Sequence, residues 1–405
     1  MSEQAKAPGN MLLRNARIVT VDRVIDNASM LIQGNRISRI ADSNSLTTAE
    51  RNSVFDLKGL TLWPGFIDLH IHGAAGVDTM QAGAEDLGHV SRFLARHGVT
   101  GWLPTVVPST AADYENAIAT IEKTMREQRP EREQGGSLNS QVLGVHYEGP
   151  FVNTEQCGAL HREHFRSFKS LNDLDTLPTI DYHGAIHMMT LAPEIEGGIE
   201  LVRELNKRGW IVSIGHTRAS ADALDQAFLA GARHMTHFMN AMASLHHRAP
   251  GPVGWGLNND EVTCDLIADG IHIDPMILRL IIRCKTPARI SLISDAIAAA
   301  GLGDGEYKIW GETISVENGR TSNARGSIAG SVINMLDDLR TMLSLGISEP
   351  DVARMASLNP ARLLGLDKDV GSIEEGKRAD LVALDQDRNV RLTIIGGLVA
   401  FNSLA

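Results

Sequence analysis

Eight short apolar segments recur between residues 65 and 294, and the stretches between them are longer and helical in pattern. Their starts are mostly about 20–40 residues apart, which is the span of one strand followed by one helix. Near-continuous apolar strands are typical of a parallel sheet buried on both faces. Eight such units predict an α/β fold, a closed (β/α)8 TIM-like barrel. The predicted strands span residues 65–72, 100–106, 142–148, 187–191, 211–215, 234–238, 263–268 and 290–294.

Both ends of the chain differ from this pattern, because their segments are rich in β-strand-forming residues and no helical stretches separate them. Alternating apolar segments separated by Asp, Asn and Gly are typical of short antiparallel strands. We expect these segments to pair into a small β-sandwich domain built from residues 1–63 and 369–405, with the barrel occupying residues 64–368. The predicted terminal strands span residues 11–19, 28–34, 36–40, 379–384, 390–395 and 398–401.

The charge and cysteine content exclude several classes of protein. Lys and Arg number 38 against 49 Asp and Glu, a net charge of −11, which argues against nucleic acid or an anionic membrane as the main partner. No apolar run is long enough to span a membrane, and residues 1–10 lack the apolar core of a signal peptide. Three cysteines without a CxxC pair predict no disulfide framework and favour a cytoplasmic location.

Histidines and a glutamate stand at the ends of several predicted strands, and the carboxyl ends of barrel strands form the functional face of this fold. Two of the histidines are two residues apart on a strand and therefore share a face. Taken singly, each side chain also has an ordinary explanation, as a core histidine or a loop glutamate. Together they predict a site for zinc or a related divalent ion. The predicted ligands are His70, His72, Glu148, His216 and His237.

Asp295, in the motif LISDA, ends the eighth predicted strand and would face the same mouth. A carboxylate beside a metal-activated water can act as general base and then as general acid. The alternative is a helix N-cap, because Asp is favoured there and an Ala-rich stretch follows.

Nine motifs, which include the residues named above, occur along the chain in an order that resembles that of the amidohydrolase superfamily. The resemblance extends from about residue 59 to the C-terminus. The combination of HYEGPF, HFMNAM and ADGIHID resembles more closely the branch that deacetylates N-acetylated amino sugar phosphates. The motifs are PGFIDLHIHG, HYEGPF, IGHT, THFMNAM, ADGIHID, LISDA, GSIAGS, SLNPARLLGL and GSIEEGKRADLVALD.

The resemblance implies a metal centre. In the family a Glu and two His hold the catalytic ion, at the positions of Glu148, His216 and His237. Some members add an HxH pair and a second ion. This chain keeps that pair, so one or two ions are expected, with Asp295 as an added ligand as well as the catalytic acid and base. Zn²⁺ is expected first, and Fe²⁺, Co²⁺ or Mn²⁺ also suit these ligands.

The resemblance also implies a phosphorylated substrate and a homodimer. An arginine contacts the sugar phosphate across the dimer interface in the family, and it matches Arg248. A guanidinium fork suits phosphate oxygens. The other matching positions are Asn240, Ala241, His272, Ile328, Ala329 and Gly330.

One segment departs from the family. After EGPF the family often has Gly-Ala-His or Gly-Ala-Gln, whose polar residue lies near the substrate carbonyl. Here Ala159 is followed by Leu160, and His161 comes one residue late. Either the loop shifts so that His161 polarises the acetyl carbonyl, or that task is done otherwise. We place Ala159 and Leu160 beside the substrate and give His161 a catalytic role.

The activity implied is hydrolysis of the acetamide of N-acetylglucosamine 6-phosphate to glucosamine 6-phosphate and acetate. An activated water would be the nucleophile, with Asp295 as general base and acid. The sequence leaves open N-acetylgalactosamine 6-phosphate as substrate, as well as another N-acyl or cyclic-amide substrate. A non-catalytic scaffold barrel is a further alternative, although such a barrel would be expected to have lost the ligands.

Overall fold

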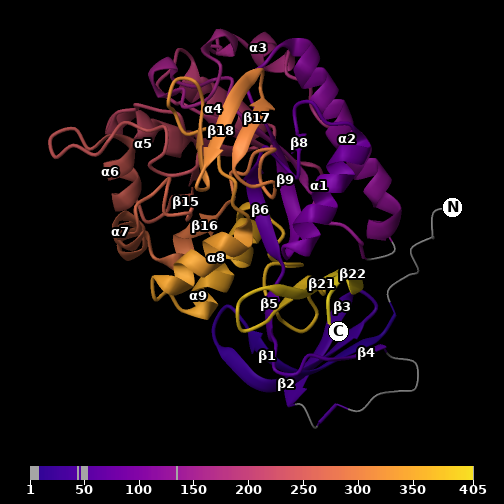
Figure 1. Cartoon of the computed structure of the whole chain (residues 1–405). Helices are drawn as coiled ribbons and strands as arrows, with labels where there is room; N and C mark the ends of the chain where they lie inside the picture. Colours follow the sequence, from indigo (N-terminus) through magenta and orange to yellow (C-terminus); the bar gives the residue numbers. More distant parts are fainter. Residues whose placement is uncertain (1–8, 43–44, 47–52, 134–135, 405) are drawn as a thin grey trace.

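The barrel predicted from the sequence is present in the computed structural model, which describes residues 9–42, 45–46, 53–133 and 136–404. Eight parallel strands follow one another around it in chain order, and helices surround them (Figure 1). Short β10 (Gln141–Val142) extends the pairing beside β9. The barrel strands are β6 (Phe66–Ile71), β9 (Val99–Val106), β11 (Gly144–Glu148), β12 (Ile186–Leu191), β13 (Ile211–Ile214), β14 (His234–Met235), β15 (Thr263–Leu266) and β16 (Ile290–Leu292).

The circle closes between β16 and β6 through the residues that follow β16. The backbone N–H of Asp295 donates to the carbonyl of His70 at 2.9 Å. The hydroxyl of Ser294 donates to the carboxyl of Asp68 at 2.6 Å, and both residues are buried. The last strand is thereby tied to the first at the end of the barrel that carries the predicted site.

Amphipathic helices cover the barrel. In α1 the buried residues Leu87, Val90, Ser91 and Leu94 stand at positions i, i+3, i+4 and i+7, which places them on one face of the helix. The helices are α1 (Ala84–Arg96), α2 (Ala111–Glu133), α3 (Leu171–Asp175), α4 (Gly198–Lys207), α5 (Ala221–Ala230), α6 (Gly251–Asn258), α7 (Pro275–Lys285), α8 (Met335–Ser344), α9 (Glu349–Ala353) and α10 (Asn359–Leu363). None of the helices within the described ranges combines the length and apolar character needed to cross a bilayer.

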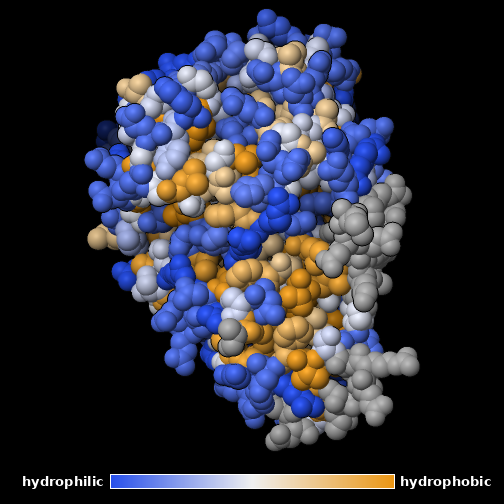
Figure 2. Space-filling view, turned by 45° about the vertical axis from the view of Figure 1, so that its right-hand side comes forward, coloured by the Kyte–Doolittle hydropathy of each residue, from blue (hydrophilic) through white to orange (hydrophobic). Residues whose placement is uncertain are grey.

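Strands from both ends of the chain form a separate sheet below the barrel in Figure 1. β5 joins the two ends, because it pairs in parallel with β1 and antiparallel with β20. This sheet has its own apolar cluster, as a small β-sandwich requires. On the face shown in Figure 2, hydrophobic residues gather over this lower part, whereas the barrel above it is mainly hydrophilic. The strands are β1 (Met11–Val19), β2 (Val24–Gln33), β3 (Arg36–Asp42), β4 (Ser53–Asp56), β5 (Thr61–Pro64), β20 (Leu381–Leu384), β21 (Val390–Ile395) and β22 (Leu398–Asn402).

The domain limits at residues 63 and 369 stay a prediction. The expectation that residues 1–10 form no signal peptide falls mostly on residues 1–8, which lie outside the described ranges.

Two small sheets were not anticipated from the sequence. β7 (Gly73–Ala74) pairs with β8 (Val77–Asp78) directly after β6. β17 (Gly305–Ile309), β18 (Glu312–Glu317) and β19 (Arg320–Ser322) form an antiparallel sheet inserted after β16. This second insertion brings a new side chain to the site.

Candidate metal centre and substrate cavity

The predicted ligands converge at the carboxyl ends of the barrel strands. His70 lies in β6 and His72 just beyond it, whereas Glu148 is the last residue of β11. His216 and His237 each stand two residues after a strand, β13 and β14. All five are buried. The structure therefore places the five side chains at one mouth of the barrel, and their role as metal ligands stays a prediction.

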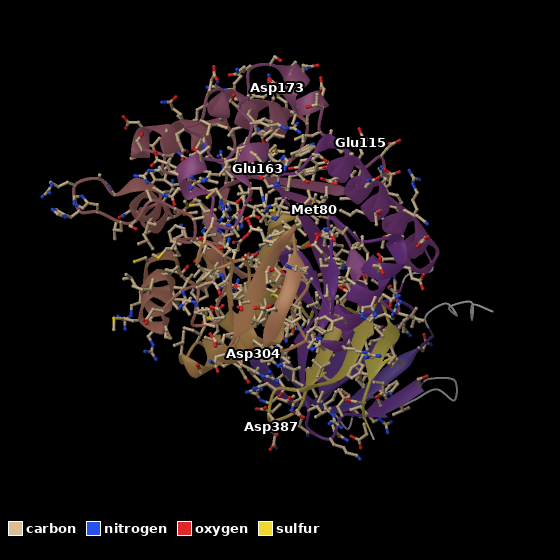
Figure 3. The ribbon with its side chains drawn as sticks, turned by 45° about the horizontal axis from the view of Figure 1, so that its top comes forward. Met80, Glu115, Glu163, Asp173, Asp304 and Asp387 are labelled. Carbon is tan, nitrogen blue, oxygen red and sulfur yellow. The ribbon has the colours of Figure 1, made fainter. Side chains whose placement is uncertain are left out.

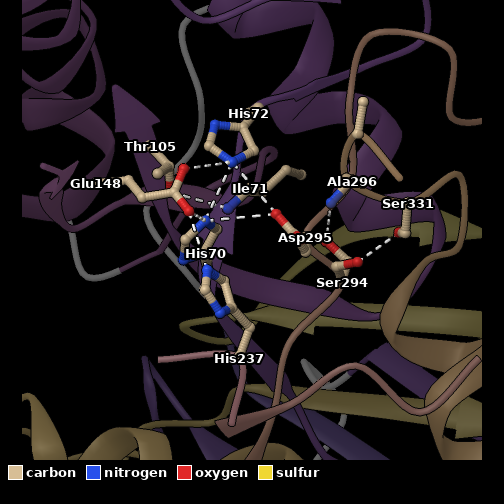
Figure 4. Close-up of polar contacts among 12 residues, drawn as sticks. His70, Ile71, His72, Thr105, Glu148, His237, Ser294, Asp295, Ala296 and Ser331 are labelled. Atoms are coloured by element: carbon tan, nitrogen blue, oxygen red, sulfur yellow. Dashed lines mark hydrogen bonds and ion pairs between the residues drawn. The ribbon is translucent and has the colours of Figure 1, made fainter. Parts of the chain in front are cut away.

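Glu148 joins two groups of ligand atoms (Figure 4). Its Oε1 lies 2.8 Å from Nε2 of His216 and 3.0 Å from Nε2 of His237, and these two nitrogens are 3.2 Å apart. On the other side, Oε2 lies 3.4 Å from Nε2 of His72, which is 3.1 Å from Nε2 of His70. Within each group the ligand atoms all lie within 4.8 Å of one another.

The chemistry of these donors fits a divalent ion. Two imidazole nitrogens and a carboxylate oxygen that point at one place form a donor set that zinc accepts. The Nδ1 of His216 lies 2.7 Å from the carbonyl of Gln156, so Nδ1 carries the proton and Nε2 presents its lone pair to the centre. Gln156, which the sequence analysis did not single out, thus orients a ligand.

The charges at this centre are strongly coupled. Burial alone would raise the pKa of the Glu148 carboxyl, but His70, His216 and His237 outweigh burial and hold that pKa well below its usual value. Burial would lower the pKa of His237, yet its contacts with Glu148 raise it to about 9. Burial dominates at His70 and holds its pKa well below the usual value, so that imidazole is neutral. In the metal-free protein, protons occupy positions that a cation would otherwise fill.

Asp295 faces the second group of ligands. Its Oδ1 lies 3.2 Å from Nε2 of His72 and 3.4 Å from Nε2 of His70. Its backbone is held on both sides, because its carbonyl accepts from the N–H of Ser331 at 2.7 Å and its N–H donates to His70. Asp295 is not an N-cap, because turns rather than a helix follow it. The structure thus places Asp295 beside the ligand nitrogens, and its role as acid and base stays a prediction.

The backbone at the centre is strained. His216, His237 and Asp295 have φ values of 48°, 32° and 49°, in the left-handed region that residues other than glycine rarely adopt. Such conformations persist where the surrounding structure enforces them, and they cluster at functional sites. They also shorten three predicted strands, because the chain turns at these residues to direct them into the mouth.

A cavity of about 330 Å³ opens beside the centre, within the range of small-molecule sites. Of the predicted substrate residues, seven line it. The predicted ligands His72, Glu148, His216 and His237 line it too, as do three residues that the sequence analysis did not single out, Gly158, Trp310 and Ser327. The seven predicted residues are Ala159, Leu160, Asn240, Ala241, His272, Ile328 and Gly330.

Two lining side chains offer polar atoms to a ligand. The Nδ2 of Asn240 is buried and has no hydrogen-bond partner among the described residues. Nδ1 of His272 lies 2.7 Å from Oδ2 of Asp269, which leaves Nε2 as the nitrogen available to the cavity. Burial would raise the pKa of Asp269, but His272 outweighs it and lowers that pKa. Asp269, another residue that sequence reasoning missed, therefore orients His272.

Three predicted residues lie outside the cavity lining. Ala329 is buried in an apolar cluster behind it. His161 lines a neighbouring cavity of about 200 Å³, with Nδ1 3.2 Å from Glu163 and Nε2 3.7 Å from Glu312. The loop therefore does not bring His161 into the main cavity, and Leu160 lies there instead. Glu163 is labelled in the upper part of Figure 3.

Arg248 stands apart from the cavity. It belongs to the exposed loop 243–250, which precedes α6 and projects at the left of Figure 1. Its guanidinium donates to Nε2 of His247 at 2.8 Å. Within one chain the structure does not bring Arg248 to the site.

Comparisons with known proteins agree with this arrangement. The model of the amidohydrolase family matches residues 61–399. N-acetylgalactosamine-6-phosphate deacetylase of Escherichia coli O157:H7 is 36% identical, over 96% of this chain and 99% of that protein. N-acetylglucosamine-6-phosphate deacetylase of Bacillus subtilis is 35% identical, over 97% and 98%. The crystal structure of N-acetylglucosamine-6-phosphate deacetylase from Pasteurella multocida superposes with a TM-score of 0.87 at 29% identity, covering 96% of this chain and 98% of that one. Because the family model matches from β5 in the terminal sheet, through the whole barrel, to β22, this chain belongs to the amidohydrolase family.

Proposed function

We propose that this protein hydrolyses the acetamide of N-acetylglucosamine 6-phosphate to glucosamine 6-phosphate and acetate. The observation that carries the proposal is the metal-ligand cluster around Glu148, which opens into a cavity of small-molecule size. Relatives similar over nearly the whole chain carry the names of deacetylases of this kind. N-acetylgalactosamine 6-phosphate is a second candidate, because the relative from E. coli O157:H7 is named for that sugar.

The proposed mechanism assigns separate tasks to the residues of the centre. Glu148, His216 and His237 would hold one divalent ion, and His70 and His72 with Glu148 a second. When bound, such an ion polarises a carbonyl and lowers the pKa of water. We propose Zn²⁺ first, with Fe²⁺, Co²⁺ or Mn²⁺ as alternatives.

Asp295 would move the proton. Its Oδ1 points toward the ligand nitrogens at 3.2–3.4 Å, so it takes a proton from the attacking water and passes it to the departing amine. Asn240 and His272 would bind oxygens of the sugar phosphate through the atoms described above. His161 lies outside the main cavity, and its catalytic role stays a proposal. The activity of a His161→Gln variant would test that role.

Amine release from three sugars, together with the metal content of the same sample, tests the activity. We expect rapid turnover of N-acetylglucosamine 6-phosphate and far slower turnover of the unphosphorylated sugar. Faster turnover of N-acetylgalactosamine 6-phosphate would favour the second candidate. A fully metallated sample that cleaves none of the three would contradict the proposal.

We further propose a cytoplasmic homodimer. All three cysteines are free, which supports a reducing compartment. The projecting loop that carries Arg248 supports a dimer in which this arginine binds the phosphate in the partner's cavity.

Replacing Arg248 by Ala is expected to raise KM for the phosphorylated sugar about 10–100-fold, because a hydrogen bond to a charged group contributes about 1.5–3 kcal/mol. Turnover at saturation should change little, because Arg248 lies away from the metal ligands. Steady-state kinetics measure both values. Arg233 offers a matched control, because its guanidinium contacts the carbonyl of Ala232 rather than the cavity.

Mixed dimers decide whether Arg248 acts across the interface. In dimers formed from Arg248→Ala and Asp295→Asn chains, one site of each mixed dimer would combine an intact Asp295 with an intact arginine from the partner. At substrate concentrations well below the wild-type KM, where Arg248→Ala sites are nearly silent, random mixing should then restore about a quarter of the wild-type activity. No recovery above the two parents would show that Arg248 does not act in trans.

A further inference from the structure

Trp310 separates two cavities. It lies at the tip of the hairpin formed by β17 and β18, and its side chain lines the catalytic cavity of about 330 Å³. The same side chain lines the second cavity of about 200 Å³, together with residues that include Val107, Asp113 and His161. Among the described residues that line either space, Trp310 is the one that both share. Met80, labelled near the centre of Figure 3, also lines the second cavity.

The hairpin holds Trp310 in a conformation that its residue type disfavours. Ile309 pairs with Glu312, so the turn has two residues, Trp310 and Gly311, with φ values of 51° and 76°. Such turns favour Asn, Asp or Gly, and a bulky side chain with positive φ is an outlier. The turn alone gives no reason for a tryptophan, so the reason lies in what the indole contacts.

The indole forms a wall of the catalytic cavity beside the metal ligands. Its ring packs edge-on against His72, with centroids 5.1 Å apart and an interplanar angle of 84°. It also packs against the buried apolar cluster of Val107, Val152 and Leu160. Trp310 and Leu160 therefore present an apolar surface next to one of the metal ligands.

The acyl group is the part of the proposed substrate that matches this wall. Its carbonyl must reach the ligand cluster, which contains His72, and its methyl group is bonded directly to that carbonyl. The sugar and phosphate are rich in oxygen and match the polar atoms of Asn240 and His272. We infer that Trp310 is a specificity-determining residue that limits the length of the acyl chain, by closing the catalytic cavity off from the second one. This inference rests on the proposed deacylation of an amino sugar phosphate.

The test compares acyl chains of increasing length on glucosamine 6-phosphate, namely acetyl, propionyl, butyryl and hexanoyl. In the wild type we expect kcat/KM to fall steeply beyond acetyl. In Trp310→Gly we expect the ratio of butyryl to acetyl activity to rise about 10–100-fold, because one methylene that does not fit changes kcat/KM about 10-fold or more. Glycine accepts positive φ, so the turn is retained.

Two further variants support the comparison. Trp310→Asn also suits the turn and should show the same change in chain-length preference. Tyr307→Phe is the matched control, because Tyr307 lies on the same hairpin, lines neither cavity and donates its hydroxyl hydrogen bond to Gly303 at 2.8 Å. That control should keep the wild-type profile.

The outcomes separate this inference from the proposed function. A wild type that cleaves the acetyl compound, with an unchanged profile in folded Trp310→Gly and Trp310→Asn, overturns the inference alone. A wild type that cleaves butyryl as fast as acetyl overturns it without any variant. If the wild type cleaves nothing, calorimetric binding of the same four compounds to the metal-loaded protein decides. If the affinity for the butyryl compound relative to the acetyl compound rises about 10-fold in Trp310→Gly, the inference that Trp310 limits the acyl chain is supported. If none of the compounds binds, both this inference and the proposed function are overturned.

Discussion

Replacing Asp295 by Asn is expected to lower kcat about 10²–10⁴-fold, the usual contribution of a general acid and base. Asn has nearly the same shape but cannot take a proton from water at neutral pH. The backbone contacts of residue 295, its N–H to His70 and its carbonyl from Ser331, do not depend on the side chain. Asp295 lies outside both three-residue ligand groups, and the Asn side chain keeps an oxygen that can take its place as the added ligand, so the metal content should stay near the wild-type level. Amine release at saturating substrate and elemental analysis measure the two quantities.

Asp304→Asn serves as the control for this prediction. Asp304 is exposed, accepts hydrogen bonds from the backbone of Asn318 and Gly319, and lines neither the catalytic cavity nor the second one. Its replacement should leave kcat unchanged. If Asp295→Asn retained more than about a tenth of the wild-type kcat, the role of Asp295 as general acid and base would be wrong.

The barrel and its ligands were predictable because the signals are local. Apolar runs mark buried strands, and the fold places the residue at the end of each run at one mouth. The ends of the runs were less predictable. β14 ends at Met235, whereas the sequence predicted a strand through Phe238, because His237 turns the backbone into the left-handed region. The apolar pattern continues past the point where the hydrogen-bonded strand stops.

The cavity wall was less predictable, because it depends on contacts between segments far apart in the sequence. Trp310 follows a segment that does not read as a barrel strand, and tryptophan is not a residue that marks a turn. The sequence left open whether His161 or Leu160 faces the substrate. In the structure Leu160 is 3% exposed, joins an apolar cluster and lines the main cavity, whereas His161 lies beside the exposed Glu163 and lines the second cavity.

Replacing Glu148 by Gln is expected to remove most of the bound metal and to reduce activity below detection. Glu148 is the one residue that belongs to both ligand groups, so its change weakens both sites at once. An amide oxygen is a weaker ligand than a carboxylate and does not balance the charge of a cation. Elemental analysis of protein purified without added metal should show less than about a tenth of the wild-type content, since loss of a ligand charge affects affinity directly.

A His70→Asn, His72→Asn double variant is the matched comparison, because it removes the second group and leaves Glu148, His216 and His237 intact. It should lose at most the second ion.

The pairing of Glu148 with His237 can also be tested in the metal-free protein, where Glu148 raises the pKa of His237 to about 9. The protonated histidine then stabilises the fold fully below its usual pKa of about 6.5, and this stability is lost as the pH rises through about 9. Chelated wild-type protein should therefore lose more of its Tm between pH 6 and pH 10 than chelated Glu148→Gln does. Equal losses in both proteins would contradict the proposed pairing of Glu148 with His237.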